Sequence, residues 1–557
     1  LGAASLAQAA GPRCALLGCG ARAGACSCEA SCRRLGDCCA DYEAACPPES
    51  APGLALGDVS LVVTTDLHSW IEGREHEPQL NATLGHVVSF LERLRAAGRR
   101  ARRDVFFFDN GDVNDGTGLS ATAPDHVAYL GPLLRKAPYD ALNIGNHELY
   151  ARDGHGALRG PECPVVGLRE SGYIASWKGR YLTSNVVWAD SREPVGSRFA
   201  VLEGEFGTRL LVFGFLYNME DHCRAVEVEN VSAVVRSQWF LSALASHGPE
   251  CDAVVVLAHM DYRDGLVDEL LRAIRPRVGE RKPIQVLAGH SHIRGWRRLD
   301  AFASAYEAGC KLDTVGFASF PLPSKGGPQG QLPFVHADLD GNTAALAGAA
   351  NVSELALLTP RGQEVVRSIA RTREALGTDA VLGCAERRYS ARSGLGEADS
   401  LWAYYMSTVL PGALFDARAR RPQWSLLGTG ALTYDVFKGP FTVDDAYTAS
   451  PYGNFWFLTR GVAGAQLAQL LAALNGPEAA GAARLPYFVN SSAPRPGEVY
   501  DVLYCDFDVD AVEQELAKLT GRRPQREVYK PALNTSSVLV EWFRGKPCRE
   551  RAPPVFA

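Results

Sequence analysis

The sequence predicts an α/β protein of several domains, in which buried strands alternate with helices. Its 557 residues are enough for two to four domains at roughly 100–200 residues each. Beyond residue 57, short apolar runs recur, each followed by polar residues. Continuous runs of this length are typical of strands covered on both faces. The runs are VSLVVTTD, DVFFFDNGD, YDALNIGNHE, LLVFGFLY, CDAVVVLAH and PIQVLAGHSH, and LGHVVSFLERLRAAGRR has the spacing of a crossover helix.

Composition and charge exclude several classes of protein. With 46% hydrophobic and 22% charged residues, the chain is globular and not wholly disordered. A net charge of −6 argues against binding to a nucleic acid polymer through a basic surface. The arginines at 99, 100, 102 and 103 are expected at a solvated helix end. No apolar run is long enough for a membrane span, and ERAPPVFA at the C-terminus carries no lipid-anchor signal.

Eight of the 15 cysteines fall within residues 14–46. So short a segment cannot bury a sufficient core, so disulfides or a metal must hold it together. The absence of histidine there favours four disulfides over zinc, and the pairing stays open. The other seven are an odd number, so at least one is free or pairs with another chain. These seven are Cys163, Cys223, Cys251, Cys310, Cys384, Cys505 and Cys548.

Other features indicate a secreted protein. Disulfides persist in oxidising compartments, and Asn-X-Ser/Thr sequences are acceptors for glycans in secreted proteins. The initial LGAASLAQAAG resembles the end of a signal peptide, with Ala7-Gln8-Ala9 as its cleavage site. The five acceptor asparagines are Asn81, Asn230, Asn351, Asn490 and Asn534.

The last six cysteines of the first segment, with the motif CCADYEAAC, resemble those of a somatomedin B domain. The resemblance implies a small disulfide-rich module at 14–46 that contacts a protein partner or another copy of the chain. A spacer without a partner is the alternative. The following PPESAPGLALG (47–57) is a predicted linker.

Acidic, amide and imidazole side chains follow five of the predicted strands. In open α/β sheets, sites form beyond the carboxyl ends of strands, so we expect these groups to meet in one crevice. Mixed His, Asp and Asn ligands suit zinc, manganese or iron, and a bridging carboxylate offsets the repulsion between two cations. The residues are Asp66, His68, Asp112, Asn146, His147, His259, His290 and His292.

The ordered motifs D-x-H, G-D-x-x-D-G, G-N-H-E, a single His and G-H-x-H resemble the calcineurin-like metallophosphatase superfamily. The resemblance implies a four-layer α/β/β/α sandwich at 58–345 and two divalent metal ions, with zinc favoured over manganese or iron. His147 would protonate the leaving oxygen, and Asp115 and Glu148 would hold the geometry of the site. The first metal would bind Asp66, His68, Asp112 and His292, and the second Asp112, Asn146, His259 and His290. The other histidines, expected to be ordinary, are His76, His86, His126, His155, His222, His247 and His336.

The remainder of the chain resembles the secreted 5′-nucleotidase family, and its fungal-type branch above all. The segment at 425–458, SLLGTGALTYDVFKGPFTVDDAYTASPYGNFWFL, carries this resemblance together with NHELY. It implies a connecting helical segment at 346–399, which contains TPRGQEVVRSIARTREAL, and an α+β substrate domain at 400–557. Within the latter, AQLAQLLAALN and DAVEQELAKL are predicted helices, and DVLYCDF and SSVLVEWF are predicted strands.

The resemblance also implies substrate contacts. Trp456 and Phe507 would stack on a nucleobase, and Asn146 would contact the phosphoryl group; packing in the core is the alternative for both rings. The chain departs from the family pattern at Thr433, where many members have arginine, and at Tyr150, where many have the aspartate that orients the catalytic histidine. Neither Thr433 nor Tyr150 is a predicted metal ligand.

The favoured function is hydrolysis of phosphomonoesters, most specifically nucleoside 5′-monophosphates, by a metal-activated hydroxide. One alternative is a phosphodiesterase or nucleotide pyrophosphatase. The other, from a different class, is a binding scaffold that acts through the somatomedin B-like module.

Overall fold

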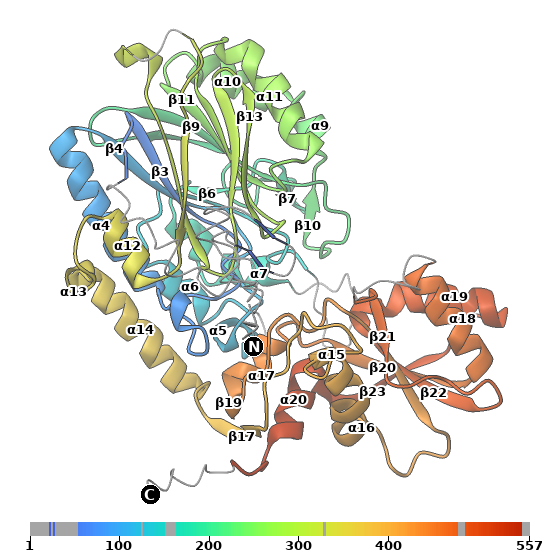
Figure 1. Ribbon diagram of the computed structural model, residues 1–557. Coiled ribbons are helices and arrows are strands. Elements are labelled where there is room, and N and C mark those ends of the chain that lie inside the picture. The colour runs from blue at the N-terminus through green and yellow to red at the C-terminus, as the bar shows by residue number, and fades with distance from the viewer. Residues whose placement is uncertain are drawn as a thin grey trace, which may run out of the picture.

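The computed structural model describes residues 22–23, 26–27, 54–123, 126–150, 163–326, 330–476 and 485–548. The predicted module at 14–46 lies outside them, except for the paired strands β1 and β2. Two α/β regions lie side by side, an N-terminal one (blue to yellow) and a C-terminal one (orange to red) (Figure 1). The short strands are β1 (Arg22–Ala23) and β2 (Cys26–Ser27).

The N-terminal region contains two six-stranded sheets. In the first, β3 to β6 are parallel, and β15 and β16 are antiparallel to their neighbours. Its order is β16 (Val335–Asp340), β15 (Thr314–Phe320), β3 (Val59–Thr64), β4 (Asp104–Asp109), β5 (Ala141–Asn143) and β6 (Tyr181–Leu182). In the second, β9, β11, β12 and β14 are parallel between two antiparallel edges. Its order is β13 (Arg294–Asp300), β14 (Ala303–Ala308), β12 (Ile284–Ala288), β11 (Ala253–His259), β9 (Arg209–Leu216) and β8 (Phe199–Glu203).

Successive side chains of each strand point to opposite faces of its sheet, and this explains the layers. Leu61 of β3 and Val255 of β11 belong to one core cluster between the two sheets, whereas Val62 and Val254 point to the opposite faces and pack against helices. Because both faces of each sheet are covered, the strands read as continuous apolar runs. The four-layer α/β/β/α prediction is therefore confirmed, and all six predicted runs are strands.

Helices cover both outer faces of the sandwich. The longest, α4, is capped by Thr83 and matches the predicted crossover. It packs against α14, which runs along the side of the region toward β17 (Figure 1). The first face carries α4 (Leu84–Ala101), α5 (Gly118–Ala121), α6 (Leu130–Leu134), α7 (Pro164–Glu170), α8 (Tyr173–Ser176), α12 (Thr343–Ala349), α13 (Glu354–Leu357) and α14 (Pro360–Leu376). The second carries α9 (Val231–Val234), α10 (Gln238–His247) and α11 (Gly265–Val278); β7 (Val186–Trp188), β10 (Val226–Val228), η1 (Pro78–Leu80) and η2 (Pro323–Lys325) complete the region.

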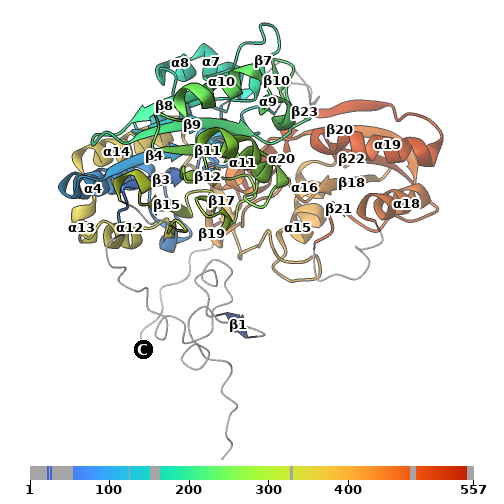
Figure 2. The same ribbon diagram turned by 90° about the horizontal axis from the view of Figure 1, so that it is seen from above.

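The C-terminal region has one five-stranded mixed sheet between two groups of helices. In Figure 2, α18 and α19 lie at the end of the molecule remote from α4. The sheet order is β21 (Phe488–Asn490), β18 (Gln423–Gly428), β22 (Val499–Cys505), β20 (Phe455–Ala463) and β23 (Arg526–Asn534), and β17 (Val381–Ala385) pairs separately with β19 (Gly439–Thr442). The helices are α15 (Leu401–Tyr404), η3 (Tyr405–Val409), α16 (Leu410–Ala413), α17 (Val443–Ala449), α18 (Gly464–Asn475), η5 (Asp506–Asp508), α19 (Val509–Thr520) and α20 (Thr535–Phe543).

One predicted strand is wrong. SSVLVEWF forms helix α20, whose first turn is capped by Asn534 through a bond from the Ser537 N–H. A short run rich in valine and aromatics does not distinguish a strand from a buried helix. The helix is favoured by the capping asparagine and by the burial of Val538 and Leu539 in the core of this region.

Buried and half-buried ion pairs join the two regions. Arg373 of α14 contacts Glu72 at 2.8 Å and Asp444 of α17 at 3.1 Å. His76 lies 3.0 Å from Asp445. Burial raises the pKa of Glu72 to about 8, with a further increase from the Asp444 charge, despite the opposing effect of Arg373. These contacts hold the C-terminal region against the N-terminal one.

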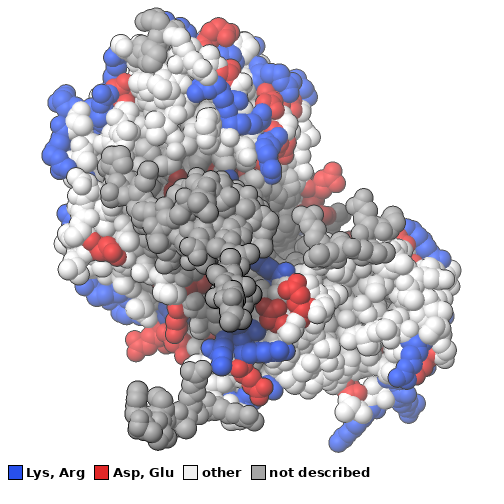
Figure 3. All heavy atoms as spheres, in the orientation of Figure 1, with Lys and Arg blue, Asp and Glu red and all other residues white. Residues whose placement is uncertain are grey.

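The described cysteines form two disulfides, Cys163–Cys223 and Cys384–Cys548. The thiols of Cys251, Cys310 and Cys505 are not in disulfides. Within the described ranges, every helix is too short or too polar to cross a membrane. Positive and negative side chains are interspersed over the face shown in Figure 3, in keeping with the net charge of −6.

Candidate metal centre

The predicted ligands converge because they lie at strand ends on one edge of the two sheets. Asp66 follows β3, Asp112 follows β4, and His290 follows β12. All three have left-handed backbones, with φ of 51°, 54° and 72°. Residues other than glycine adopt this conformation at a cost of about 1–3 kcal/mol each, and such strain gathers at functional sites.

Two motif glycines allow this close approach. A Cβ on Gly145 would lie 2.1 Å from Oδ1 of Asp112, and one on Gly289 would lie 2.8 Å from Oδ2 of Asp66. No side chain fits in either place. The glycines of G-N-H-E and G-H-x-H are therefore required by the proximity of two strand-end turns.

The ligand atoms form two groups, within each of which all atoms lie within 4.8 Å of one another. Asp112 belongs to both. Its Oδ2 lies 3.1 Å from Nε2 of His259 and 3.9 Å from Nε2 of His68. Oδ1 of Asn146 joins the second group at 3.0 Å from Nε2 of His259. The groups are Asp66, His68, Asp112 and His292, and Asp112, His259 and His290.

Hydrogen bonds to backbone carbonyls orient two of the histidines so that their Nε2 atoms face this point. Nδ1 of His68 contacts the Asn114 carbonyl at 3.0 Å, and Nδ1 of His259 contacts the Asn110 carbonyl at 2.8 Å. Each Nδ1 must carry a proton, so Nε2 is the ring atom left to bind a metal. Nε2 of His68 also lies 3.1 Å from Nε2 of His292. Burial would lower the pKa of His259, but the charges of Asp112 and Asp66 raise it to about 10, so in the absence of an ion this ring carries the positive charge that balances the carboxylates. A bound cation would supply that charge in its place.

Burial keeps two of the histidines in the neutral form that binds metal. Burial lowers the pKa of His68 to about 3, helped by the charges of His147 and His292. Burial also lowers the pKa of His290 to about 4. Burial alone would raise the pKa of Asp112, but His259 and His147 hold it well below its ordinary value. The imidazoles of His68 and His290 are therefore neutral, and the Asp112 carboxylate, which belongs to both groups, is charged.

Glu148 supports the bridging ligand from behind. Its carboxylate accepts hydrogen bonds from the backbone N–H groups of Asp112 at 3.0 Å, Val113 at 2.9 Å and Gly145 at 2.8 Å. It thereby ties the turn after β4 to the turn after β5. This is the geometric role expected for the glutamate of G-N-H-E.

His147 is oriented by a carboxylate from another motif. Its Nδ1 donates to Oδ2 of Asp115 at 2.8 Å, and the other Asp115 oxygen accepts from Nδ1 of His126 at 2.6 Å. Burial opposes protonation of His147, but Asp112 and Asp115 raise its pKa above the ordinary value. Asp115 thus replaces the aspartate missing at position 150. His126, which no motif in the sequence marks, therefore lies next to this pair of residues.

Tyr150 has a different task from the aspartate it replaces. Its hydroxyl accepts from Nδ2 of Asn146 at 3.1 Å, which turns Oδ1 of Asn146 toward His259. Its ring meets the ring of His147 edge-on, with centroids 5.0 Å apart. The tyrosine therefore fixes the amide ligand and packs beside the histidine.

The C-terminal region contributes a ring that sequence reasoning did not single out. Tyr452 stacks against His147 with centroids 5.7 Å apart. By contrast, Trp456 is 0% exposed in the core of its own region, so its ring is not available to a base. Phe507 is 48% exposed. Thr433 bonds within its own region, from its N–H to the Ala449 carbonyl at 2.9 Å.

Substitution of His259 by alanine should lower the metal content from about two ions per chain to about one. It removes the imidazole closest to Asp112 in the second group but leaves the four ligands of the first. Elemental analysis of purified, metal-loaded protein measures this. His336→Ala, at a histidine outside the cluster, is the control and should keep the full content; equal losses in both variants would contradict the assignment.

Comparisons with known proteins agree with this architecture. Residues 13–49 match the somatomedin B domain, and residues 387–496 match the C-terminal domain of NAD nucleotidase. A relative described as a secreted protein of Arthroderma benhamiae is 27% identical over 467 residues, which cover 76% of this chain and 68% of the relative.

Solved structures show the same fold. A 5′-nucleotidase from Candida albicans superposes with a TM-score of 0.78 and 22% identity, covering 89% of this chain and 99% of that one. A 5′-nucleotidase precursor from Thermus thermophilus gives a TM-score of 0.61 and 18% identity, with 87% and 96% covered. The chain therefore has the 5′-nucleotidase fold, with a somatomedin B match near its start and a NAD nucleotidase match in its C-terminal region.

Proposed function

We propose that the chain is a secreted, metal-dependent phosphomonoesterase that releases phosphate from nucleoside 5′-monophosphates. The observation that carries the proposal is the convergence of imidazole, carboxylate and amide groups around Asp112, with His147 beside them. The fold likeness to 5′-nucleotidases supports the substrate class. The relative described as a secreted protein, the somatomedin B match and the disulfides support secretion.

The donor set favours zinc, because imidazole nitrogens outnumber carboxylates in it. Asp66, His68, Asp112 and His292 would hold one ion, and Asp112, Asn146, His259 and His290 the other. Two divalent ions supply Lewis acidity and lower the pKa of a bound water toward neutrality. The remaining steps belong to the side chains of the chain itself.

His147 is proposed as the general acid. Its Nδ1 proton is engaged with Asp115, so Nε2 is the atom that delivers a proton to the leaving oxygen of the ester. Asp115 favours the imidazolium form by its charge, and His126 binds the second oxygen of Asp115 and fixes its orientation. Asn146 would bind a metal through Oδ1, and because only one N–H of its amide is engaged with Tyr150, the second can donate to a phosphoryl oxygen.

Tyr452 is proposed as the base-binding ring. It comes from the C-terminal region and lies against His147, so a ligand that reaches both the ring and the metal ligands must span the two regions. A nucleotide, with a base at one end and a phosphate at the other, has this form. Phe507 remains a candidate for a second ring because it is exposed.

We also propose that the chain divides into a metallophosphatase domain at 58–345, a connecting helical segment at 346–399 and a substrate domain at 400–557.

A second candidate function for the chain is nucleotide pyrophosphatase activity, which the NAD nucleotidase match at 387–496 favours. A protein partner for the somatomedin B-like segment is compatible with either activity.

Phosphate release from AMP should require metal. A chelator should abolish activity and added zinc or manganese should restore it, as measured by phosphate release. AMP should be cleaved faster than NAD and faster than a bis-nitrophenyl diester. His147→Ala should lower kcat for AMP by about 10²–10⁴-fold, the usual contribution of a general acid, and keep its metal. Activity that survives chelation contradicts the proposal, and a fully functional His147→Ala variant favours the scaffold.

The Asp115→Asn variant should discriminate between leaving groups. Without the carboxylate charge, His147 protonates poorly, so kcat for AMP should fall by about tenfold or more. Hydrolysis of p-nitrophenyl phosphate should fall less, because nitrophenolate leaves without a proton. His126→Gln should change the ratio of the two rates in the same direction by less. Asp510→Asn, at an exposed position of α19, is the control; a parallel fall for both substrates would contradict the assignment.

Tyr452→Ala should raise KM for AMP by about tenfold, since a base–ring stack contributes about 1–3 kcal/mol. KM for glycerol phosphate, which has no base, should stay within about twofold. Tyr487→Ala, at an exposed tyrosine of the same region, is the matched control. Equal KM changes for both substrates would exclude a base-binding role.

A further inference from the structure

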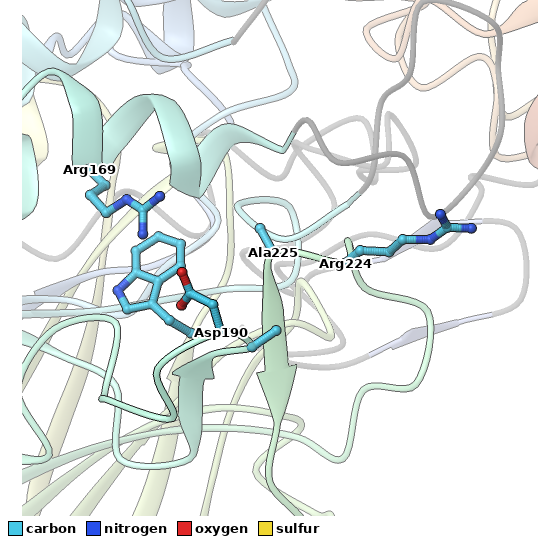
Figure 4. A pocket seen from close by; sticks show the side chains of 6 residues that line it. Arg169, Asp190, Arg224 and Ala225 are labelled. Atoms are coloured by element: carbon cyan, nitrogen blue, oxygen red, sulfur yellow. The ribbon is translucent and has the colours of Figure 1, made fainter.

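Two cavities of the N-terminal region lie outside the metal cluster. The first, of about 370 Å³, is lined by Arg169, Trp188, Asp190 and Arg224. The Arg169 guanidinium lies 3.9 Å from the centroid of the Trp188 ring. In Figure 4, Arg224 extends away from Arg169. Its two arginines do not converge, so this cavity does not define a ligand.

The second cavity differs because four arginines line it. Its volume is about 420 Å³, within the range of about 300–1,000 Å³ usual for ligand pockets. Buried Tyr139 and Trp177 contribute to its walls. Asp140 is the one carboxylate among its lining residues. The four arginines are Arg95, Arg135, Arg180 and Arg361.

These arginines come from four separate parts of the chain. Arg95 lies in α4, Arg135 caps the C-terminus of α6, and Arg361 lies in the first turn of α14. Arg180 directly precedes β6. Convergence of four distant segments is a property of the tertiary fold, and no run of basic residues in the sequence produces it.

The cavity lies at the opposite end of the first sheet from the metal cluster. Asp140 directly precedes β5 and Arg180 directly precedes β6, and Arg95 donates to the carbonyl of Val105 near the start of β4 at 3.1 Å. These are the amino ends of parallel strands, whereas the metal ligands follow their carboxyl ends. The cavity is therefore separate from the catalytic crevice.

Much of the positive charge is not compensated within the cavity. Arg95 pairs with Asp140 at 2.6 Å, and that carboxylate also accepts from the Phe107 N–H at 2.7 Å. Arg180 and Arg361 donate to neutral backbone carbonyls, at 3.3 Å and 3.0 Å. In the described part of the chain, the bonds of Arg95, Arg180 and Arg361 use at most two N–H groups of each guanidinium, out of five.

One ion pair lies next to the lining residues in the sequence. Lys136 pairs with Glu364 at 3.8 Å, so these two charges balance. The N-terminus of the 17-residue helix α14 lies at the same place, since Arg361 is in its first turn. A helix N-terminus carries a partial positive charge and adds to the attraction for an anion.

We propose that this arginine pocket, defined by Arg95, Arg135, Arg180 and Arg361, binds a phosphate or sulfate group. Guanidinium groups pair with such oxyanions through two parallel N–H bonds. A tetrahedral anion has three or more acceptor oxygens and can bind several forks around one point, which a carboxylate with two oxygens does less well. The source is a free anion or a sulfated polysaccharide, and binding does not depend on the proposed hydrolysis.

Isothermal titration of the full chain with sodium sulfate and with a sulfated disaccharide tests the proposal. Arg135 and Arg361 are exposed, so the double variant R135A/R361A should fold and retain its hydrolytic rate. It should bind the probes at least about tenfold more weakly than the wild type. R135K/R361K keeps the charges without the forks and should lie between the two. Arg367→Ala, on the exposed side of the same helix, is the matched control and should bind as the wild type does.

The two probes distinguish the sources. Binding of sulfate lost in R135A/R361A shows that a free anion suffices, and binding of the disaccharide alone shows that a polysaccharide is required; both support the site. The proposal is overturned if neither probe binds the wild type saturably. It is equally overturned if R135A/R361A binds both probes within about twofold of the wild type.

Discussion

The convergence of acceptor atoms around Asp112 is the constraint on which the rest of the structure depends. Nε2 of His68 and Nε2 of His259 both approach its carboxylate, and in the absence of an ion the protonated His259 balances its charge. Burying charged and polar groups this close together is unfavourable unless each has a partner. The fold nevertheless holds them together through left-handed turns and the Glu148 bonds, which is the arrangement expected of a binding site formed before its ion arrives.

The catalytic crevice also depends on contact between the two α/β regions. Asp444 accepts from the Gly118 N–H at 2.7 Å and binds Arg373, so one carboxylate connects α17, α5 and α14. Tyr452 reaches His147 from the same side. Alignment of a substrate would thus require the two regions to keep this relation, and the ion pairs between them act on binding as well as on stability.

The convergence of Asp66, Asp112 and His290 could be predicted from the sequence, because the residues that follow parallel strands lie at one edge of the sheet. The sequence did not predict His126, which follows α5 in a loop and acts only through Asp115. The left-handed backbone conformations of the predicted ligands could not be predicted from the sequence either, because they arise from the packing of neighbouring turns.

The aromatic residues show the other limit of sequence reasoning. In SPYGNFWFL several rings lie close together, and the one that faces the site depends on where β20 starts. Because the strand begins at Phe455, Trp456 points into the core and Tyr452 remains in the preceding turn. A similar ambiguity hid α20, whose apolar residues suit a strand as well as a helix until the Asn534 cap is considered.

The bond between Cys384 and Cys548 ties the first strand of the C-terminal region, β17, to the residues after its last helix, α20. Both ends of that region are consequently anchored at one corner, close to where α14 delivers the chain. Rotation of the region as one body would concentrate its torsional change in residues 377–380, between α14 and β17. The disulfide thus joins the two ends of this region to each other, so that any rotation relative to the N-terminal region would occur at one connection.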